Sequence, residues 1–232
     1  MELLLHSLWE SLQLIGRLDR DLLSALVTTL RVSITSTAIA ALISLPLGFL
    51  IAKSSFRGKR VVLNLLRTAL ALPTVVVGLF VYAFIARNTP LGGLGLLFTP
   101  TAIVIGQVLL IIPLVTALVH SAVQDTVHPV YEEALLLGAS PLQASAKALV
   151  ESRLAVTTAL MTGFGRVISE VGISLVLGGN IRGVTRTITT AITLETSQGE
   201  FAAAFALGIV LLALVFCISL IIQMTDRRRE AV

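Results

Sequence analysis

Long apolar runs dominate this sequence and limit what the chain can fold into. An α-helix needs ~20 apolar residues to cross a bilayer, and five runs meet that length: 23–52, 61–86, 101–123, 154–177 and 201–224. In lipid, only helices or closed barrels satisfy the backbone, and these runs are too long and too unalternating for barrel strands. Only 13% of the residues are charged, against ~25% in soluble domains. The sequence therefore predicts an all-α polytopic membrane protein, with a single domain over residues 1–232.

The stretch ahead of the first run, residues 1–16, is apolar but short, and His6, Glu10 and Gln13 interrupt it. Its leucines recur at helical spacing, which favours an amphipathic helix in the membrane interface over a further span. No cationic segment precedes this stretch and no small-residue cleavage site follows it. We therefore do not expect a removed signal peptide.

Basic residues between the apolar runs predict the orientation of the chain. Lys and Arg are more frequent in the connections 53–60 and 124–153 and after residue 224 than in the connections 87–100 and 178–200. Because cytoplasmic loops carry the excess of Lys and Arg, we expect the N-terminus outside and the C-terminus in the cytoplasm. The position of these residues at the ends of apolar runs favours contact with membrane lipid and argues against a nucleic-acid partner.

The sequence offers no pattern for catalysis or for a metal site. Cys217 is the only cysteine, and His6, His120 and His128 lack the spacing of metal ligands. No Walker-type sequence occurs, and neither a Ser/His nor a paired-Asp arrangement stands at catalytic spacing. We expect no catalytic residue, no metal and no cofactor in this chain, which argues against an intramembrane enzyme.

A polar segment, residues 129–148, separates the third and fourth runs. We expect a short helix over 129–138 with Glu132 and Glu133 in its first turn, where carboxylates offset the helix dipole. The glycine at the end of this helix suits the position after a helix C-terminus, and the Ser-Pro pair at 140–141 suits the start of a second helix. Docking into a groove of a partner protein and a surface loop on the membrane are both open from the residues alone.

The same segment resembles the EAA loop of ABC-importer permeases in its order Glu-x-Ala-x3-Gly-Ala-Ser. In that family the loop is a coupling helix that sits in a cleft of the ATPase subunit. The Leu-Pro pair that the family carries further along is replaced here by the sequence of residues 148–151. The resemblance implies these ATPase-coupling residues: Glu132, Glu133, Ala134, Gly138, Ala139 and Ser140.

Two further stretches resemble oxyanion permeases. The stretch LALPTVVVGLFVY around Pro73 resembles their proline-bearing pore helix. Within residues 163–201, Glu-x-Gly and Gly-Gly-Asn-Ile-x-Gly-x-Thr-Arg-Thr are shared with molybdate permeases, whereas Thr-Thr-Ala-Ile-x-Leu-Glu-Thr followed by Gly-Glu-Phe resembles tungstate permeases. The chain thus resembles the permease subunit of tungstate ABC importers, with molybdate or another oxyanion as the alternative substrate.

This resemblance implies a fold, a location and partners. The fold would be the type I (MetI-like) permease core of about five membrane helices, in the cytoplasmic (inner) membrane of a prokaryote. The partners would be a second permease copy in a homodimer, a cytoplasmic ABC ATPase dimer that binds ATP and Mg, and an external tungstate-binding protein. A self-sufficient secondary transporter is the competing class, but no inverted repeat is evident in the sequence.

Small, hydroxyl-bearing and charged residues are candidates for the anion pathway, because burying an unpaired dianion is costly. Glu170 is an ionisable residue within a predicted span, and Arg166 lies four residues earlier on the same predicted helical face, so we expect a gate or a packing latch there. We expect the two arginines of the predicted external mouth to receive the anion or to contact the binding protein. The alternative is that they anchor the chain at lipid headgroups. The pathway or gate candidates are Pro73, Arg166, Glu170, Ser174, Gly178, Gly179 and Asn180, and the external-mouth candidates are Arg182, Thr185, Arg186 and Thr187.

Overall fold

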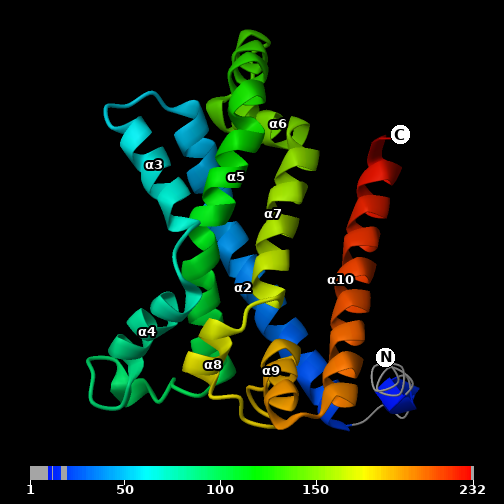
Figure 1. Cartoon of the computed structure of the whole chain (residues 1–232). Helices are drawn as coiled ribbons and strands as arrows, with labels where there is room; N and C mark the ends of the chain where they lie inside the picture. The colour runs from blue at the N-terminus through cyan, green and yellow to red at the C-terminus, as the bar shows by residue number, and fades with distance from the viewer. Residues whose placement is uncertain (1–9, 12, 17–19, 231–232) are drawn as a thin grey trace. The chain divides into compact units, whose positions relative to one another are not determined.

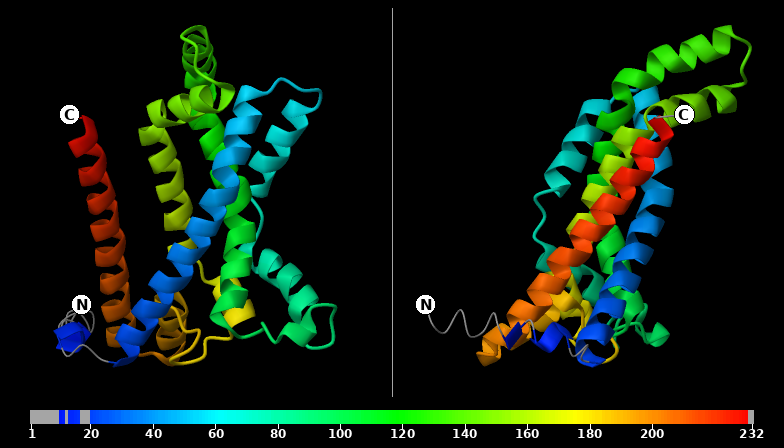
Figure 2. Two further views of the ribbon diagram at one scale, coloured as in Figure 1. Left: turned by 180° about the vertical axis from the view of Figure 1, so that it is seen from behind. Right: turned by 90° about the vertical axis from the view of Figure 1, so that its right-hand side faces the viewer.

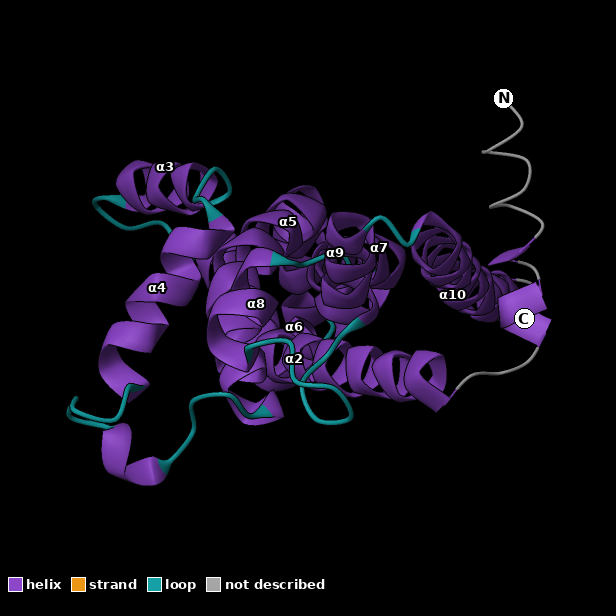
Figure 3. Cartoon of the chain, turned by 60° about the horizontal axis from the view of Figure 1, so that its bottom comes forward, coloured by secondary structure: helices purple, strands orange, loops and turns teal. Residues whose placement is uncertain are grey.

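Helices make up the ordered elements of the computed structural model, which describes residues 10–11, 13–16 and 20–230 (Figure 1). No strand occurs among these residues, as Figure 3 shows, which confirms the predicted all-α class. The elements are α2 (Arg20–Lys53), α3 (Lys59–Ala69), α4 (Thr74–Ile85), η1 (Gly92–Leu94), α5 (Pro100–Leu136), α6 (Pro141–Glu151), α7 (Arg153–Ile168), α8 (Gly172–Gly178), α9 (Ile188–Gln198) and α10 (Phe201–Glu230).

Three helices are long and apolar enough to cross a membrane by themselves, namely α2, the part of α5 over Pro100–Gln124, and α10 over Phe201–Leu220. Two broken pairs, α3 with α4 and α7 with α8, meet the same test only when each pair counts as one span. The described residues thus provide up to five spans. Of the expected N-terminal amphipathic helix, 10–11 and 13–16 are helical, and the remainder lies outside the described residues.

The second and fourth predicted spans are interrupted. Between α3 and α4 the chain leaves the helix over 70–73, because Pro73 lacks an N–H and disfavours a helical conformation at the residue before it. Between α7 and α8 it leaves the helix over 169–171, where the Glu170 side chain accepts the N–H of Ile173 and thus competes with the helical pattern. The predicted spans 61–86 and 154–177 therefore each consist of two helices joined by a short break.

Two other elements differ from the sequence-based expectation. Helix α5 runs without interruption through Pro129 to Leu136, so the first half of the polar segment is the end of a long helix and not a short helix of its own. Helix α9 lies within 178–200, which the sequence predicts only as a connection. Its N-terminus carries a capping box in which Thr187 and Thr190 exchange side-chain and backbone hydrogen bonds.

The chain divides into two compact units. The first comprises 1–35, 74–107 and 168–232, and the second comprises 36–73 and 108–167. In the first unit, α9 packs between α2 and α10 through a buried cluster: Ala25, Ile188, Ala191 and Leu207. There α4 also lies against α8 so closely that a Cβ on Gly172 would stand 2.8 Å from Thr74 Oγ1.

The second unit joins α2, α5, α6 and α7. Its buried cluster comprises Phe49, Ala52, Val123, Val127, Ala148 and Val156. Gly48 allows α2 to approach α5, because a Cβ there would stand 2.7 Å from Val119 Cγ1. The end of α5 and helix α6 run side by side as a helical hairpin (Figure 2). This packing supports the corner that carries the predicted coupling residues.

Candidate functional site

The corner between α5 and α6 is a Schellman motif. Gly138 has a φ of 89°, in the left-handed region where glycine is favoured. The N–H of Ala139 donates to the carbonyl of Ala134 at 2.9 Å, and the N–H of Gly138 donates to the carbonyl of Leu135 at 3.0 Å. These are the two hydrogen bonds that define the motif. The spacing Ala-x3-Gly-Ala therefore has a local structural cause, and the glycine prediction is confirmed.

The second helix of the corner starts as its sequence predicts. Ser140 is the N-cap of α6, and Pro141 is its first residue. The Ser140 N–H donates to Gln143 Oε1 at 2.8 Å, and the Gln143 N–H donates to Ser140 Oγ at 3.4 Å. This capping box fixes the direction in which the chain leaves the corner.

The two acids of the segment lie elsewhere on their helix than we expected. Glu132 and Glu133 stand near the C-terminal end of α5, not in a first turn, because the helix continues through Pro129. Carboxylates at a helix C-terminus are disfavoured by the helix dipole, and both side chains are exposed. The helix dipole therefore does not stabilise these two side chains at their positions. It leaves two acidic groups beside the corner, available to a partner.

Large apolar side chains are also exposed close to the corner in sequence. Leu136, Leu137 and Leu142 are 88%, 81% and 81% exposed. Exposed apolar groups next to charged ones mark an interaction surface more often than an inert loop. The corner thus has a rigid backbone, an apolar tip and an acidic flank.

A second group of predicted residues lies in the first unit, around the joint that precedes α8. Glu170 is 2% exposed, and its Oε1 accepts the N–H of Ile173 at 3.1 Å. Its backbone carbonyl accepts Ser174 Oγ at 3.3 Å and Thr189 Oγ1 at 2.9 Å. The side chain and the backbone of Glu170 thereby connect the joint to α8 and to α9, which is the geometry of a latch.

Arg166 does not stand on a common helix with Glu170. Helix α7 ends at Ile168, so one continuous helix through both residues was the wrong expectation. Arg166 lines a cavity of about 270 Å³ in the second unit. The other lining residues are Ala69, Leu70, Leu110, Leu114 and Thr162.

The loop from Gly178 to Thr187 is held together by its own polar groups. Thr185 Oγ1 donates to the Gly178 carbonyl at 2.5 Å and accepts the N–H of Ile181 at 3.0 Å. Thr185 and Thr187 are both buried. Their hydroxyls therefore close the loop and cap α9, and the Thr-Arg-Thr pattern has a structural cause of its own.

Gly179 and Asn180 make the turn that opens this loop. Both have positive φ, 69° and 52°, which glycine and asparagine tolerate better than other residues. A Cβ on Gly179 would stand 2.7 Å from the ring of Phe98. Asn180 donates from Nδ2 to the Thr190 carbonyl at 3.5 Å, while its buried Oδ1 has no hydrogen-bond partner among the described residues.

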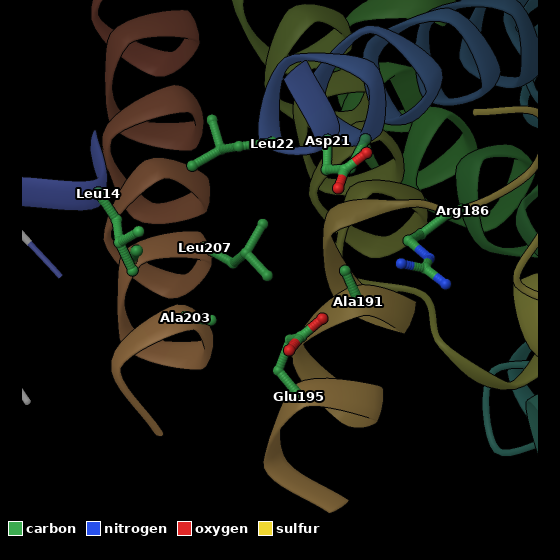
Figure 4. A pocket seen from close by; sticks show the side chains of 10 residues that line it. Leu14, Asp21, Leu22, Arg186, Ala191, Glu195, Ala203 and Leu207 are labelled. Carbon is green, nitrogen blue, oxygen red and sulfur yellow. The ribbon is translucent and has the colours of Figure 1, made fainter. Parts of the chain in front are cut away.

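The two arginines of the predicted external mouth differ in their surroundings. Arg182 is exposed and pairs with Asp21, with 2.7 Å between Nε and Oδ1. Arg186 lines a cavity of about 260 Å³ together with Asp21 and Glu195, as Figure 4 shows. Its buried Nε has no hydrogen-bond partner within the described part of the chain. The cavity thus combines one guanidinium with two carboxylates.

Sequence reasoning missed several residues of this region. Thr189 and Thr190 are buried, and Thr29 of α2 accepts the N–H of Ile188 at 2.8 Å. Thr189 Oγ1 also lies 2.9 Å from Thr187 Oγ1. The only signal in the sequence was the density of threonines ahead of an apolar segment, which does not reveal which partner each hydroxyl has.

Interrupted membrane helices are typical of membrane transporters, and the joint at Glu170 is such an interruption, buried and hydrogen-bonded. Residues 44–231 match the model of the family described as "Binding-protein-dependent transport system inner membrane component". The chain belongs to this family, which has the type I (MetI-like) permease fold, and it is a multi-pass membrane protein.

Two relatives resemble the chain over nearly its whole length. The "Tungstate uptake system permease protein TupB" of Peptoclostridium acidaminophilum is 37% identical over 96% of this chain and 97% of its own. The protein of the same name from Campylobacter jejuni is also 37% identical, over 94% of this chain and 91% of its own. The "Molybdenum transport system permease protein ModB" of Azotobacter vinelandii is more distant, at 27% identity over 78% of this chain and 84% of its own.

Proposed function

We propose that the chain is the membrane-spanning permease subunit of an ATP-driven importer for tungstate. The observation that carries the proposal is the 37% identity to two tungstate permeases along almost the whole chain, ten percentage points above the identity to the molybdenum permease. Molybdate is the second candidate substrate, because tungstate and molybdate are both tetrahedral dianions.

The subunit acts without catalysis of its own in this proposal. Two copies form the pathway, a cytoplasmic ATPase dimer binds and hydrolyses ATP with Mg, and an external binding protein delivers the anion. The corner at Gly138, with its exposed leucines and the acids Glu132 and Glu133, supports the role of a docking element for the ATPase. One chain offers one such corner, so two ATPase subunits call for two permease copies.

Movement follows from the rigidity of this corner. Its Schellman motif and capping box tie α5 to α6, so a displacement of the corner by the ATPase moves both helices together. Rigid-body movement of helices opens the pathway first to one side and then to the other. The orientation that fits has the N-terminus outside and both the corner and the C-terminus in the cytoplasm, as the distribution of Lys and Arg favours.

The joint at Glu170 is the proposed gate element. It lies where a membrane helix is interrupted and is linked to α8 and α9 by three hydrogen bonds. A buried carboxylate in the path would repel an anion, so Glu170 serves as a latch and not as a ligand. Arg182 and Arg186 receive the anion or contact the binding protein.

The test is competition for uptake by the assembled complex in cells. Tungstate uptake should require this chain and should be inhibited more strongly by unlabelled tungstate than by an equal concentration of molybdate or sulfate. Stronger inhibition by molybdate would assign the chain to molybdate. Uptake that persists after the chain is deleted would remove the proposed role.

A further inference from the structure

Helix α3 carries a basic face that neither the coupling corner nor the Glu170 joint uses. Arg60, Asn64 and Arg67 recur at spacings of four and three residues and therefore lie on one side of the helix. All three side chains are exposed. We call these three residues the α3 basic face. No acidic residue occurs between Lys59 and Ala69.

The other sides of α3 are apolar. Val62, Leu63 and Leu66 are partly buried, whereas Val61 and Leu65 are 61% and 64% exposed. No residue of this helix is fully buried. The helix therefore presents a packed side, an apolar side suited to lipid and a separate polar side.

The depth of the basic face decides what it can contact. Arg60 and Arg67 are seven residues apart, which is about 10 Å along a helix axis and a third of the ~30 Å hydrocarbon core. Helix α3 is a candidate for part of a membrane span only together with α4, from which it is bent by 99°. Guanidinium groups within the hydrocarbon are costly, and in membrane proteins such groups turn towards water-filled cavities or towards partners.

A cavity continues from the C-terminal end of this helix. Ala69 and Leu70 line the cavity of about 270 Å³ that also contains Thr162 and Arg166 of α7. Since a water molecule occupies about 30 Å³ in the liquid, this volume accommodates a small hydrated anion. Thr162 and Arg166 thus bring a hydroxyl and a guanidinium to a cavity that begins where α3 ends, and these residues all belong to the second unit.

We propose that the α3 basic face lines the aqueous pathway and binds the tetrahedral oxyanion in passing. The proposal rests on the transport function proposed above. A guanidinium presents a planar fork of N–H donors that matches two oxygens of such an anion, and the Asn64 amide supplies a further donor. Water in the pathway would keep each contact weak enough for release, because water and salt screen charge interactions.

The phosphate of an anionic lipid headgroup offers the same chemistry, since it also presents tetrahedral oxygens. The lipid-suited side of α3, with Val61 and Leu65, is distinct from the basic face, which favours the transported anion as the occupant. The experiment separates these two sources by changing the lipid.

The experiment uses the complete complex in proteoliposomes, with tungstate-loaded binding protein added on the outer side of the transporter. Arg60→Gln/Arg67→Gln is compared with wild type and with Arg57→Gln, an exposed basic residue of the loop before α3. The readout is tungstate transported per ATP hydrolysed. We expect the double variant to lower this ratio about tenfold, a loss typical for removal of strong charge contacts. ATP hydrolysis stimulated by the binding protein should remain, and Arg57→Gln should match wild type.

Two further arms keep the test decisive. Arg60→Lys/Arg67→Lys retains the charge but not the planar fork of donors, so it should recover part of the transport, even if the Gln variant assembles poorly. The defect of the Gln variant should be equal in vesicles of phosphatidylcholine alone and in vesicles that also contain phosphatidylglycerol.

Three results would overturn the proposal: normal transport per ATP in the Gln variant, a defect that appears only with phosphatidylglycerol, or a Lys variant as impaired as the Gln variant. A wild-type complex that moves no tungstate would instead contradict the transport function itself, so the two failures are distinguishable.

Discussion

The carboxylate of Glu170 accepts a hydrogen bond from the backbone N–H of Ile173, with 3.1 Å between Oε1 and N. The bond lies at the interruption between α7 and α8 and satisfies one of the free N–H groups at the start of α8. The position that sequence reasoning marks as an ionisable residue inside a span therefore also accepts a backbone N–H in the first turn of α8.

Glu170→Ala should lower the free energy of unfolding by about 1–2 kcal/mol, because it removes a buried acceptor at a helix N-terminus. Glu170→Gln retains an amide oxygen at the same place and should remain near wild type in thermal stability and in assembly with the ATPase. The neutral amide binds the helix N-terminus less strongly, so uptake by Glu170→Gln should fall. Unchanged uptake would leave Glu170 a structural role only.

Thr185→Val should destabilise the first unit by about 1–3 kcal/mol, since it leaves the buried Gly178 carbonyl and the Ile181 N–H without their hydroxyl partner. Thr185→Ser keeps the hydroxyl and is the matched control. Thermal unfolding of the purified protein in detergent measures both. Equal melting temperatures for the Val and Ser variants would contradict this account of the loop.

Gly138→Ala should strain the coupling corner by about 1 kcal/mol, because a side chain at positive φ is disfavoured. The stimulation of the partner ATPase by the loaded binding protein should weaken as the corner loses its geometry. Gly93→Ala is the control, since a Cβ there meets open space. A Gly138→Ala complex with wild-type stimulation would show that the Schellman geometry is not needed for coupling.

Arg182→Gln should change the unfolding free energy by less than about 1 kcal/mol, because its ion pair with Asp21 is exposed.

The double variant Arg182→Gln/Arg186→Gln should lower the rate of tungstate uptake when the binding-protein concentration is limiting, because long-range charge attraction speeds association. This loss of uptake should be smaller at high salt, which screens the attraction. Asp21→Asn breaks the same ion pair without removing a cation and serves as control. Unimpaired uptake in the double variant would rule out a role for both arginines at the mouth.

Local patterns in the sequence were sufficient to predict the structure where a short segment determines its own conformation. Gly138 and Ser140 were placed correctly, because helix ends depend on backbone conformation and on hydrogen bonds within a few residues. Mean hydropathy likewise identified the segments that are able to cross a membrane. The importer-permease family followed from the motif in residues 132–140, and the oxyanion class from motifs within residues 163–201.

Features that depend on distant packing were missed or misplaced. The breaks at 70–73 and 169–171 lie within predicted spans that also carry Pro73 and Glu170, but the sequence does not show that the helix ends at these residues. Glu132 and Glu133 were misplaced because Pro129 looks like a helix start, whereas membrane-protein helices tolerate prolines in their interior. Helix α9 was missed because its capping box uses Thr190 in place of the usual Glu or Gln.

The most direct test of the central claim is ATP-dependent accumulation of tungstate by the purified complex in proteoliposomes. The complex contains this chain, its ATPase and its binding protein. We predict that tungstate accumulates only when ATP is present on the ATPase side and loaded binding protein is present on the other side. Accumulation should occur with the wild-type ATPase, and it should not occur with an ATPase that is unable to hydrolyse ATP. Accumulation by this chain alone, driven by an ion gradient without the ATPase, would contradict the account and identify a secondary transporter.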